Sequence, residues 1–163
     1  MVAFVTRMPK GIPGDITRQS QATIEAAVLN PSAAFAGFGL FGKINAGKFE
    51  PIGSGDAASA VYGLLIRPYP SQGANASDPL GTAVPKTSGI ADVLRRGYAN
   101  VKVNAGTAAQ GGKVYIRVAG AAAGKPVGGI EAAADSTNTI EVAGAFFMDA
   151  ADASGNAEIA FNI

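Results

Sequence analysis

The sequence predicts an all-β fold: a compact β-barrel or a jelly-roll-like sandwich, with an extended N-terminal arm and long loops rich in Gly, Ala and Pro. Three observations predict it. Val and Ile number 24 together against 6 Leu, and branching at Cβ favours the pleated surface of a sheet. Several segments alternate apolar and polar residues with a period of two. The 22 Gly and 9 Pro are spread along the chain, as turns between short strands require.

The first part of the chain differs from the rest. We expect residues 1–31 to form an extended N-terminal arm and residues 32–163 to form a single β-rich domain. Apolar residues recur in this arm between prolines, so two interpretations stay open. It is either an edge strand and loop packed on its own domain, or an arm that becomes ordered against a neighbouring subunit. Residues 23–29 could form a short helix, but their alternation favours a strand.

The middle of the chain is predicted to contain a hairpin turn, a strand and a long loop. Residues 45–48 (Asn-Ala-Gly-Lys) are typical of a hairpin turn. An apolar run at 61–67 predicts a strand that ends at Pro68, and the composition of residues 68–85 predicts a long surface loop. Residues 88–97 predict one helical turn, because Ser88 can cap its start and Gly97 its end, and a strand through Val93 fits nearly as well.

Two hairpins are predicted in the last third of the chain. Alternating residues at 101–103 and 113–118 predict two strands joined by the Gly/Ala-rich loop 106–112. A strand over 140–146, with Gly144 as a bulge, is joined to a final strand at 159–163 by the loop 149–156. Because the chain finishes on Ile163, we expect this terminus to be packed.

Two glycine-rich segments resemble nucleotide-binding motifs without meeting their requirements. Residues 37–42 fit G-x-G-x-x-G, but that site needs a helix directly after it, and the glycines and proline that follow prevent one. Residues 42–49 lack the Ser or Thr that a P-loop uses to hold Mg²⁺. We therefore interpret these glycines as structural.

The composition argues against an enzyme. The chain has no His and no Cys, which removes the usual base of hydrolytic triads, thiolate metal sites and cysteine nucleophiles. An acidic loop with Asp149, Asp152, Asn156 and Glu158 could offer oxygen ligands to Ca²⁺, but its spacing is not that of an EF-hand. We expect no catalytic residues, no cofactor and no metal.

The charge distribution gives no reason to expect nucleic acid or membrane as a partner. The chain has thirteen basic and twelve acidic residues, for a net charge of +1. The sequence therefore shows neither a polybasic segment nor the excess of positive charge that binding to phosphates requires. The longest uncharged apolar run, residues 33–42, is too short to span a bilayer. The first residues do not have the pattern of a signal peptide. We expect a protein that is made and used without secretion.

Six segments, in order along nearly the whole chain, carry a resemblance to a known family. They are GDITR (14–18), ATIE (22–25), VYGLLIRPYP (61–70), VLRRGY (93–98), GGKVYIRV (111–118) and AEIAFN (157–162). In these segments the chain resembles the structural cement, or head decoration, proteins of tailed bacteriophages.

The resemblance implies a virion protein, made in the host cytoplasm, that lies on the outer face of an expanded capsid and bridges major capsid proteins. It also implies self-association at capsid symmetry axes, as a homotrimer or alternatively a homodimer. From residue type and position, the candidates for capsid or neighbour contacts are Phe4, Arg7, Ile12, Ile16, Arg18, Arg95 and Arg96. The alternative function is a phage tail or baseplate adhesin that binds host-surface receptors.

Overall fold

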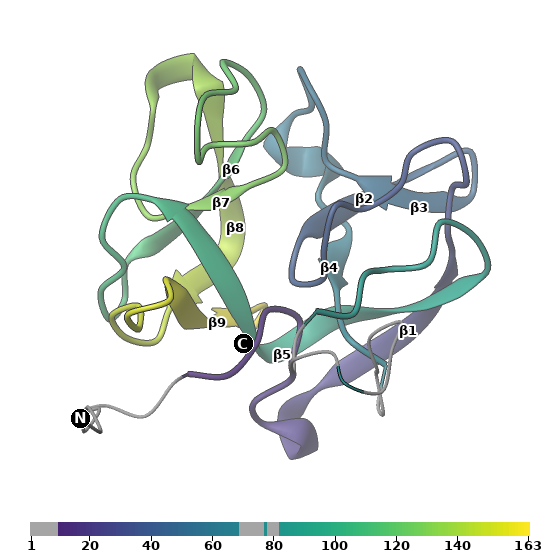
Figure 1. Cartoon of the computed structure of the whole chain (residues 1–163), viewed down its shortest axis with the longest axis horizontal. Helices are drawn as coiled ribbons and strands as arrows, with labels where there is room; N and C mark the ends of the chain where they lie inside the picture. The colour runs from purple at the N-terminus through teal and green to yellow at the C-terminus, as the bar shows by residue number, and fades with distance from the viewer. Residues whose placement is uncertain (1–9, 69–76, 78–81) are drawn as a thin grey trace.

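The longest strand, β5 (Ile90–Ala105), takes part in two sheets and joins two lobes that lie side by side (Figure 1). The structure is a computed structural model that describes residues 10–68, 77 and 82–163. The all-β prediction is confirmed, because the described residues form strands β1 to β9 and three 3₁₀ turns of three residues each. These turns are η1 (Gln19–Gln21), η2 (Ala58–Ala60) and η3 (Ser136–Asn138).

One lobe is a closed barrel. The second half of β5 pairs with β7 (Ile130–Glu131), and the order continues through β6 (Lys113–Arg117), β8 (Thr139–Phe147) and β9 (Asn156–Phe161). The barrel closes because β9 pairs with β5 from Gly97 to Lys102. A closed barrel leaves no strand edge unpaired, and the barrel prediction is confirmed.

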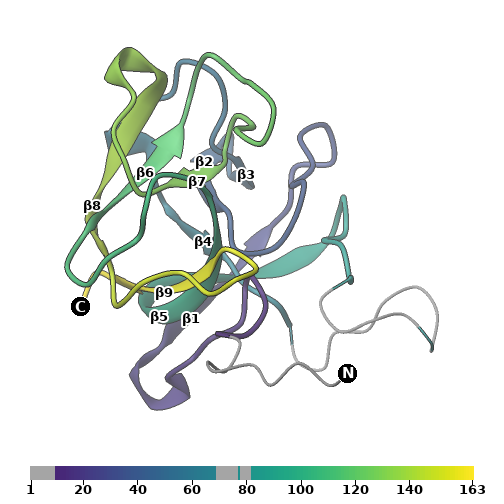
Figure 2. The ribbon, with the colours of Figure 1, turned by 60° about the vertical axis from the view of Figure 1, so that its left-hand side comes forward.

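The other lobe is a curved sheet, which we call the open sheet. Its order is β3 (Lys48–Pro51), β2 (Phe41–Asn45), β4 (Gly63–Leu65), the first half of β5 and β1 (Thr23–Val28). After β1, Leu29 forms a bridge with Phe49 of β3, so the sheet curls back toward its own first strand. The turned view shows β1, β5 and β9 following one another across the junction of the lobes (Figure 2).

The two faces of the open sheet contribute to two different cores. Leu94 and Leu64 join the main core, which fills the barrel and extends between the lobes. Val93, the next residue along β5, points to the opposite face, as alternation requires, and joins a smaller core with Leu29, Phe35, Phe49 and Leu65. Its Phe35 and Phe49 rings stack with centroids 5.0 Å apart.

A buried ion pair joins β6 and β7. The side chains of Arg117 and Glu131 are 1% and 2% exposed, and their closest atoms, Nε and Oε1, are 2.5 Å apart. Arg117 also donates to Asp135, at 2.6 Å, and to the carbonyl oxygens of Ala119 and Gly120. These bonds raise the pKa of Arg117 above its ordinary value and lower the pKa of Asp135. Each of the three guanidinium nitrogens of Arg117 therefore donates a hydrogen bond to an oxygen of the protein.

Three local predictions from the sequence are wrong. Residues 88–97 hold no helical turn, because β5 begins at Ile90 and pairs with both β1 and β4. Strands β5 and β6 do not form a hairpin around residues 106–112, since β7 lies between them and pairs in parallel with β5. Ile163 is not packed but 49% exposed. In the first two cases the outcome depends on which distant strands pair with β5. The periodicity of the sequence does not specify strand partners.

Other local predictions are confirmed. The strand predicted at 61–67 is present as β4, shortened to three residues. The loop 149–156 joins β8 to its antiparallel partner β9. Gly144, with a φ of 74°, lies where the β6–β8 register is irregular. Most of the predicted loop at 68–85 lies outside the described residues.

The glycines of the 37–42 motif, which we interpret as structural, have unequal surroundings. A Cβ at Gly42 would lie 2.5 Å from two ring carbons of Phe49, whereas a Cβ at Gly37 would meet nothing within 4 Å. Gly42 also faces Gly63 across the β2–β4 pair. The open sheet therefore needs glycine at position 42 to admit the Phe49 ring.

The part of the predicted arm that the structure describes packs on its own chain. Residues 23–28 form β1, antiparallel to β5, and Ile16 makes a bridge with Ala99. For these residues, the strand on its own domain is the interpretation that the structure supports. The division into arm and domain at residue 31 stays a prediction, and residues 1–9 lie outside the described part.

The β2–β3 turn predicts a stabilising substitution. Ala46 and Gly47 have φ of 48° and 75°, the combination of a type I′ turn, which favours Asn-Gly. Because Asn adopts this conformation more readily than Ala, we expect Ala46→Asn to raise the free energy of unfolding by about 0.5–1 kcal/mol. Denaturant unfolding measures it, with Ala46→Val as the destabilising comparison. A less stable Asn variant would contradict the assignment of the turn.

No helix in the described ranges is long and apolar enough to cross a membrane.

Candidate interaction surface

The structure describes five of the seven predicted contact residues, and Phe4 and Arg7 lie outside its described residues. Ile12 and Ile16 are half-buried, and Ile16 packs against the main core. Both residues belong to a segment, residues 10–21, that crosses β5 and β9. Their contribution to any partner contact stays a prediction.

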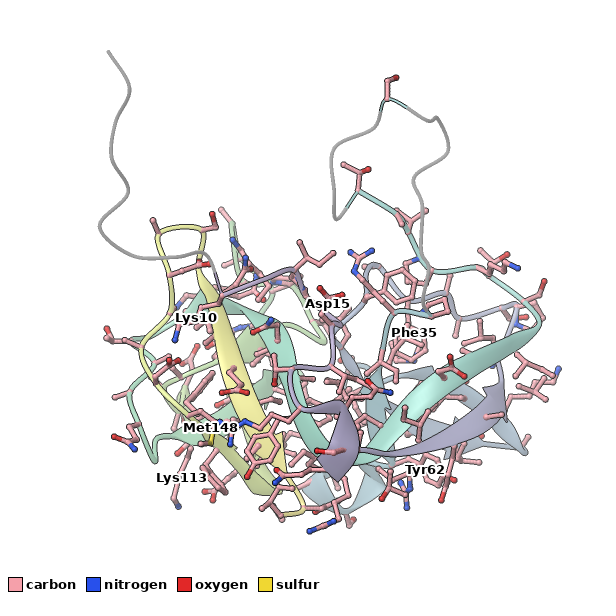
Figure 3. All side chains as sticks on the ribbon, turned by 90° about the horizontal axis from the view of Figure 1, so that it is seen from below. Lys10, Asp15, Phe35, Tyr62, Lys113 and Met148 are labelled. Atoms are coloured by element: carbon pink, nitrogen blue, oxygen red, sulfur yellow. The ribbon has the colours of Figure 1, made fainter. Side chains whose placement is uncertain are left out.

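Asn100 on β5 holds this segment in place. Its side-chain amide donates to the carbonyl of Lys10 at 2.6 Å, while its backbone bonds to Gly14 and Asp15 at 2.8 and 2.9 Å. Lys10 also forms an ion pair with Asp149. Figure 3 shows Lys10 beside the end of the yellow β9 and Asp15 nearer the middle of the molecule. Residues 10–15 therefore run from the barrel toward the open sheet along a fixed path.

Arg18 is held by a tyrosine and a carboxylate of its own chain. Its guanidinium carbon lies 3.9 Å from the centroid of the Tyr98 ring. Two of its nitrogens donate to the two oxygens of Glu158, at 3.2 and 3.1 Å, which is the bidentate geometry that arginine prefers. One face and one edge of the guanidinium are thus occupied.

Arg95 is held in the same way on the open sheet. Its guanidinium carbon lies 3.6 Å from the centroid of Tyr62, and its Nε lies 3.4 Å from Glu25. The Tyr62 hydroxyl donates to the same carboxylate at 2.6 Å, and this bond raises the pKa of Tyr62. Arg18 and Arg95 therefore each stack on a tyrosine of their own chain, Arg18 on Tyr98 and Arg95 on Tyr62.

Arg96 differs from both of these arginines. It is exposed, opposite Thr23 in the β1–β5 pair. Among the described residues, no carboxylate lies within ion-pair distance of it. An exposed guanidinium without an intrachain partner keeps its full capacity for carboxylates on another molecule. Of the three predicted arginines that the structure describes, Arg96 is thus the best placed to bind a partner.

A second surface was missed by the sequence reasoning. Two adjoining pockets of about 360 and 350 Å³ share Ile66, Pro68 and Asp92. Together they form a groove beside β1 and the first half of β5, which we call the β1–β5 groove. Four large apolar side chains on or beside it are between 39% and 76% exposed: Ile24, Val28, Val84 and Ile90. An exposed apolar patch of this kind marks an interaction site more often than single exposed residues do.

Ile24, Asp92 and Ile90 line the groove from a face of the open sheet that extends beyond the barrel, and Leu29, Leu65 and Ala91 line it from the opposite face. Leu94 of β5 and its partner Ile24 share a face, and Leu94 is fully buried in the main core. Asp92 and Ile90, two and four residues before Leu94, lie on the same face. The barrel does not cover this part of the sheet, so both side chains reach solvent. The alternation of Ile24, Ala26 and Val28 was visible in the sequence, but it usually marks a buried face.

The acidic loop has a structural role. Asp152 accepts backbone N–H bonds from Lys10, Ser154 and Asn156, at 2.9 to 3.0 Å. Burial alone would raise the pKa of Asp152, but these bonds outweigh it and lower that pKa. Within the described ranges, no group of three or more carboxylates is arranged to hold a metal ion.

Both the sequence and the fold of this chain are similar to those of known proteins. The model of a protein family described as XM1 gp53 minor capsid protein matches residues 1–161. The chain belongs to this family. Among solved structures, a chain in the capsid of Myoviridae phage XM1 has the same fold, with a TM-score of 0.67 and 21% sequence identity. The match covers 98% of this chain and 95% of that one. No curated protein matches.

Membership of the XM1 gp53 minor capsid protein family confirms the resemblance to capsid-associated phage proteins that the six segments carry. The match over 98% of the chain includes both lobes, so the barrel and the open sheet together form the unit shared with the XM1 capsid chain.

Proposed function

We propose that this chain is a cement protein that binds the outer surface of an expanded phage capsid and bridges its major capsid proteins. The observation that carries the proposal is the family match over residues 1–161. A bridging protein needs two separate contact surfaces. Exposed Arg96 offers a cationic contact on one of them, and self-association would supply further copies of it.

Cementing of this kind follows from linkage. A protein that binds the expanded shell and not its precursor stabilises the expanded form by RT ln(1 + [L]/Kd), about 2.7 kcal/mol per site at a hundredfold excess over Kd. Repetition over many equivalent sites multiplies this term. No catalytic step is part of this function. Self-association as a homotrimer or a homodimer would place several copies of each surface around one axis.

The test compares shell binding by the wild type and by Arg96→Glu, with Lys48→Glu as the control. Lys48 is exposed at the start of β3, so the control changes net charge equally. We expect co-sedimentation with expanded shells and none with unexpanded ones, with a roughly tenfold weaker affinity for Arg96→Glu alone. Equal binding to both shell forms would contradict the cement function. Binding to host cells and not to shells would favour the adhesin.

A further inference from the structure

The β1–β5 groove carries an acidic group among apolar side chains. Asp92 is half-buried and lies between Ile24, Ile66 and Pro68 in the lining of the groove. Its side chain has no ion-pair partner among the residues that the structure describes. A cation on another molecule can therefore pair with this carboxylate without displacing an existing partner.

The other charged residues of the groove do not neutralise Asp92. Arg67 donates to the carbonyl oxygens of Pro13 and Ala83. Its Nε lies 4.0 Å from the Asp15 carboxylate, and its guanidinium stacks on the Phe38 ring. Burial raises the pKa of Asp15, and the positive charge of Arg67 only partly offsets this rise. Lys86 is exposed at the far end of the lining. The groove therefore fits an extended segment with apolar residues and a cation near Asp92.

The first nine residues of the chain have this chemistry. Their sequence, Met-Val-Ala-Phe-Val-Thr-Arg-Met-Pro, combines Phe4 and Val5 with Arg7 and contains no acidic residue. They lie outside the described residues, and the described chain begins at Lys10. Fully extended, nine residues span about 30 Å, which is enough to reach a neighbouring molecule.

The position of Lys10 favours the groove of a second copy. Lys10 is held at the barrel end by Asp152 and Asn100, while Asp15, five residues later, already lines the groove (Figure 3). The chain therefore runs toward its own groove after Lys10, and the residues before Lys10 start from the more distant end.

We propose that residues 1–9 of one copy bind in the β1–β5 groove of a second copy, with Arg7 paired to Asp92 and Phe4 among the apolar side chains. The occupant is thus this chain's own N-terminal arm, exchanged between neighbours. The interaction combines backbone and side-chain contacts of an extended peptide with one ion pair that sets its register. It links copies to each other and does not depend on the proposed binding to the shell.

The chain contains no Cys, so engineered thiols report the contact cleanly. Arg7→Cys and Asp92→Cys are prepared as separate full-length proteins, mixed and oxidised, and the mixed disulfide is identified by mass spectrometry. Ile90→Cys, at a position that is 72% exposed in the groove, is a second acceptor in case Asp92→Cys folds poorly. Lys113→Cys is the control, because Lys113 is exposed on the barrel (Figure 3).

We expect the groove positions to give at least about tenfold more mixed disulfide with Arg7→Cys than Lys113→Cys gives, since docking raises the effective concentration of the two thiols. Equal yields at the groove and control positions would overturn the proposal. So would a disulfide that forms within one molecule of an Arg7→Cys/Asp92→Cys double variant but never between molecules. Arm exchange without shell binding would overturn the cement function and leave this inference standing.

Discussion

Arg117→Met is expected to lower Tm by roughly 10 °C, because it leaves Glu131 as a buried charge without its partner. Glu131 is 1% exposed, and its carboxylate receives both of its side-chain hydrogen bonds from Arg117. Asp135 suffers less, since its side chain is 40% exposed and can be hydrated. Thermal unfolding followed by circular dichroism measures the change.

The double variant Arg117→Met/Glu131→Leu separates the charge effect from packing. It removes both charges, so we expect it to recover much of the lost Tm. Lys113→Met is the control, because it breaks an ion pair with Glu141 whose side chains are 62% and 45% exposed. Exposed pairs contribute little, and its Tm should change by no more than about 2 °C. If the double variant were as unstable as Arg117→Met, the loss would come from packing.

Gly42→Ala is expected to lower the free energy of unfolding by about 2–3 kcal/mol, because its Cβ would overlap the Phe49 ring. The ring cannot move away easily: Phe49 is fully buried and stacked on Phe35. A second clash, with the carbonyl oxygen of Glu50 at 2.7 Å, involves backbone and leaves no room for a rotamer change. Denaturant unfolding measures the loss.

Gly37→Ala is the matched control, since it removes another glycine of the same motif. Its Cβ would meet nothing within 4 Å, so its free energy of unfolding should stay within about 0.5 kcal/mol of the wild type or rise slightly. Similar losses for the two variants would contradict the assignment of distinct roles. If neither variant were destabilised, the close packing of Phe49 on Gly42 would be wrong.

Strand positions were predictable wherever alternation and turn chemistry coincide. Residues 113–118 alternate and become β6, and Asn45 to Lys48 carry the turn between β2 and β3. Prediction failed at residues 88–97, because the capping signals of a short helix are weak compared with two flanking strands that pair with the same backbone. Tertiary pairing overrides local propensity in such segments.

The candidate surfaces were predictable in part. Residue type identified Arg18, Arg95 and Arg96 as binding candidates, but not that Glu158 and Glu25 of the same chain hold the first two. Glu158 is 140 residues from Arg18, and spacing along the chain does not reveal such a pair. The β1–β5 groove was missed for a related reason: its lining comes from several separate parts of the sequence between Asp15 and Asp92.

The sequence by itself determined the all-β class, the turn at residues 45–48 and the lack of thiol and imidazole chemistry, because these depend on residue type and on neighbours a few positions away. Only the tertiary structure decided that β7 separates β5 from β6, that Arg96 has no described partner, and that Ile24 and Ile90 reach solvent. Strand order and burial depend on contacts between distant segments, and the free energy that selects them comes from the packed core as a whole.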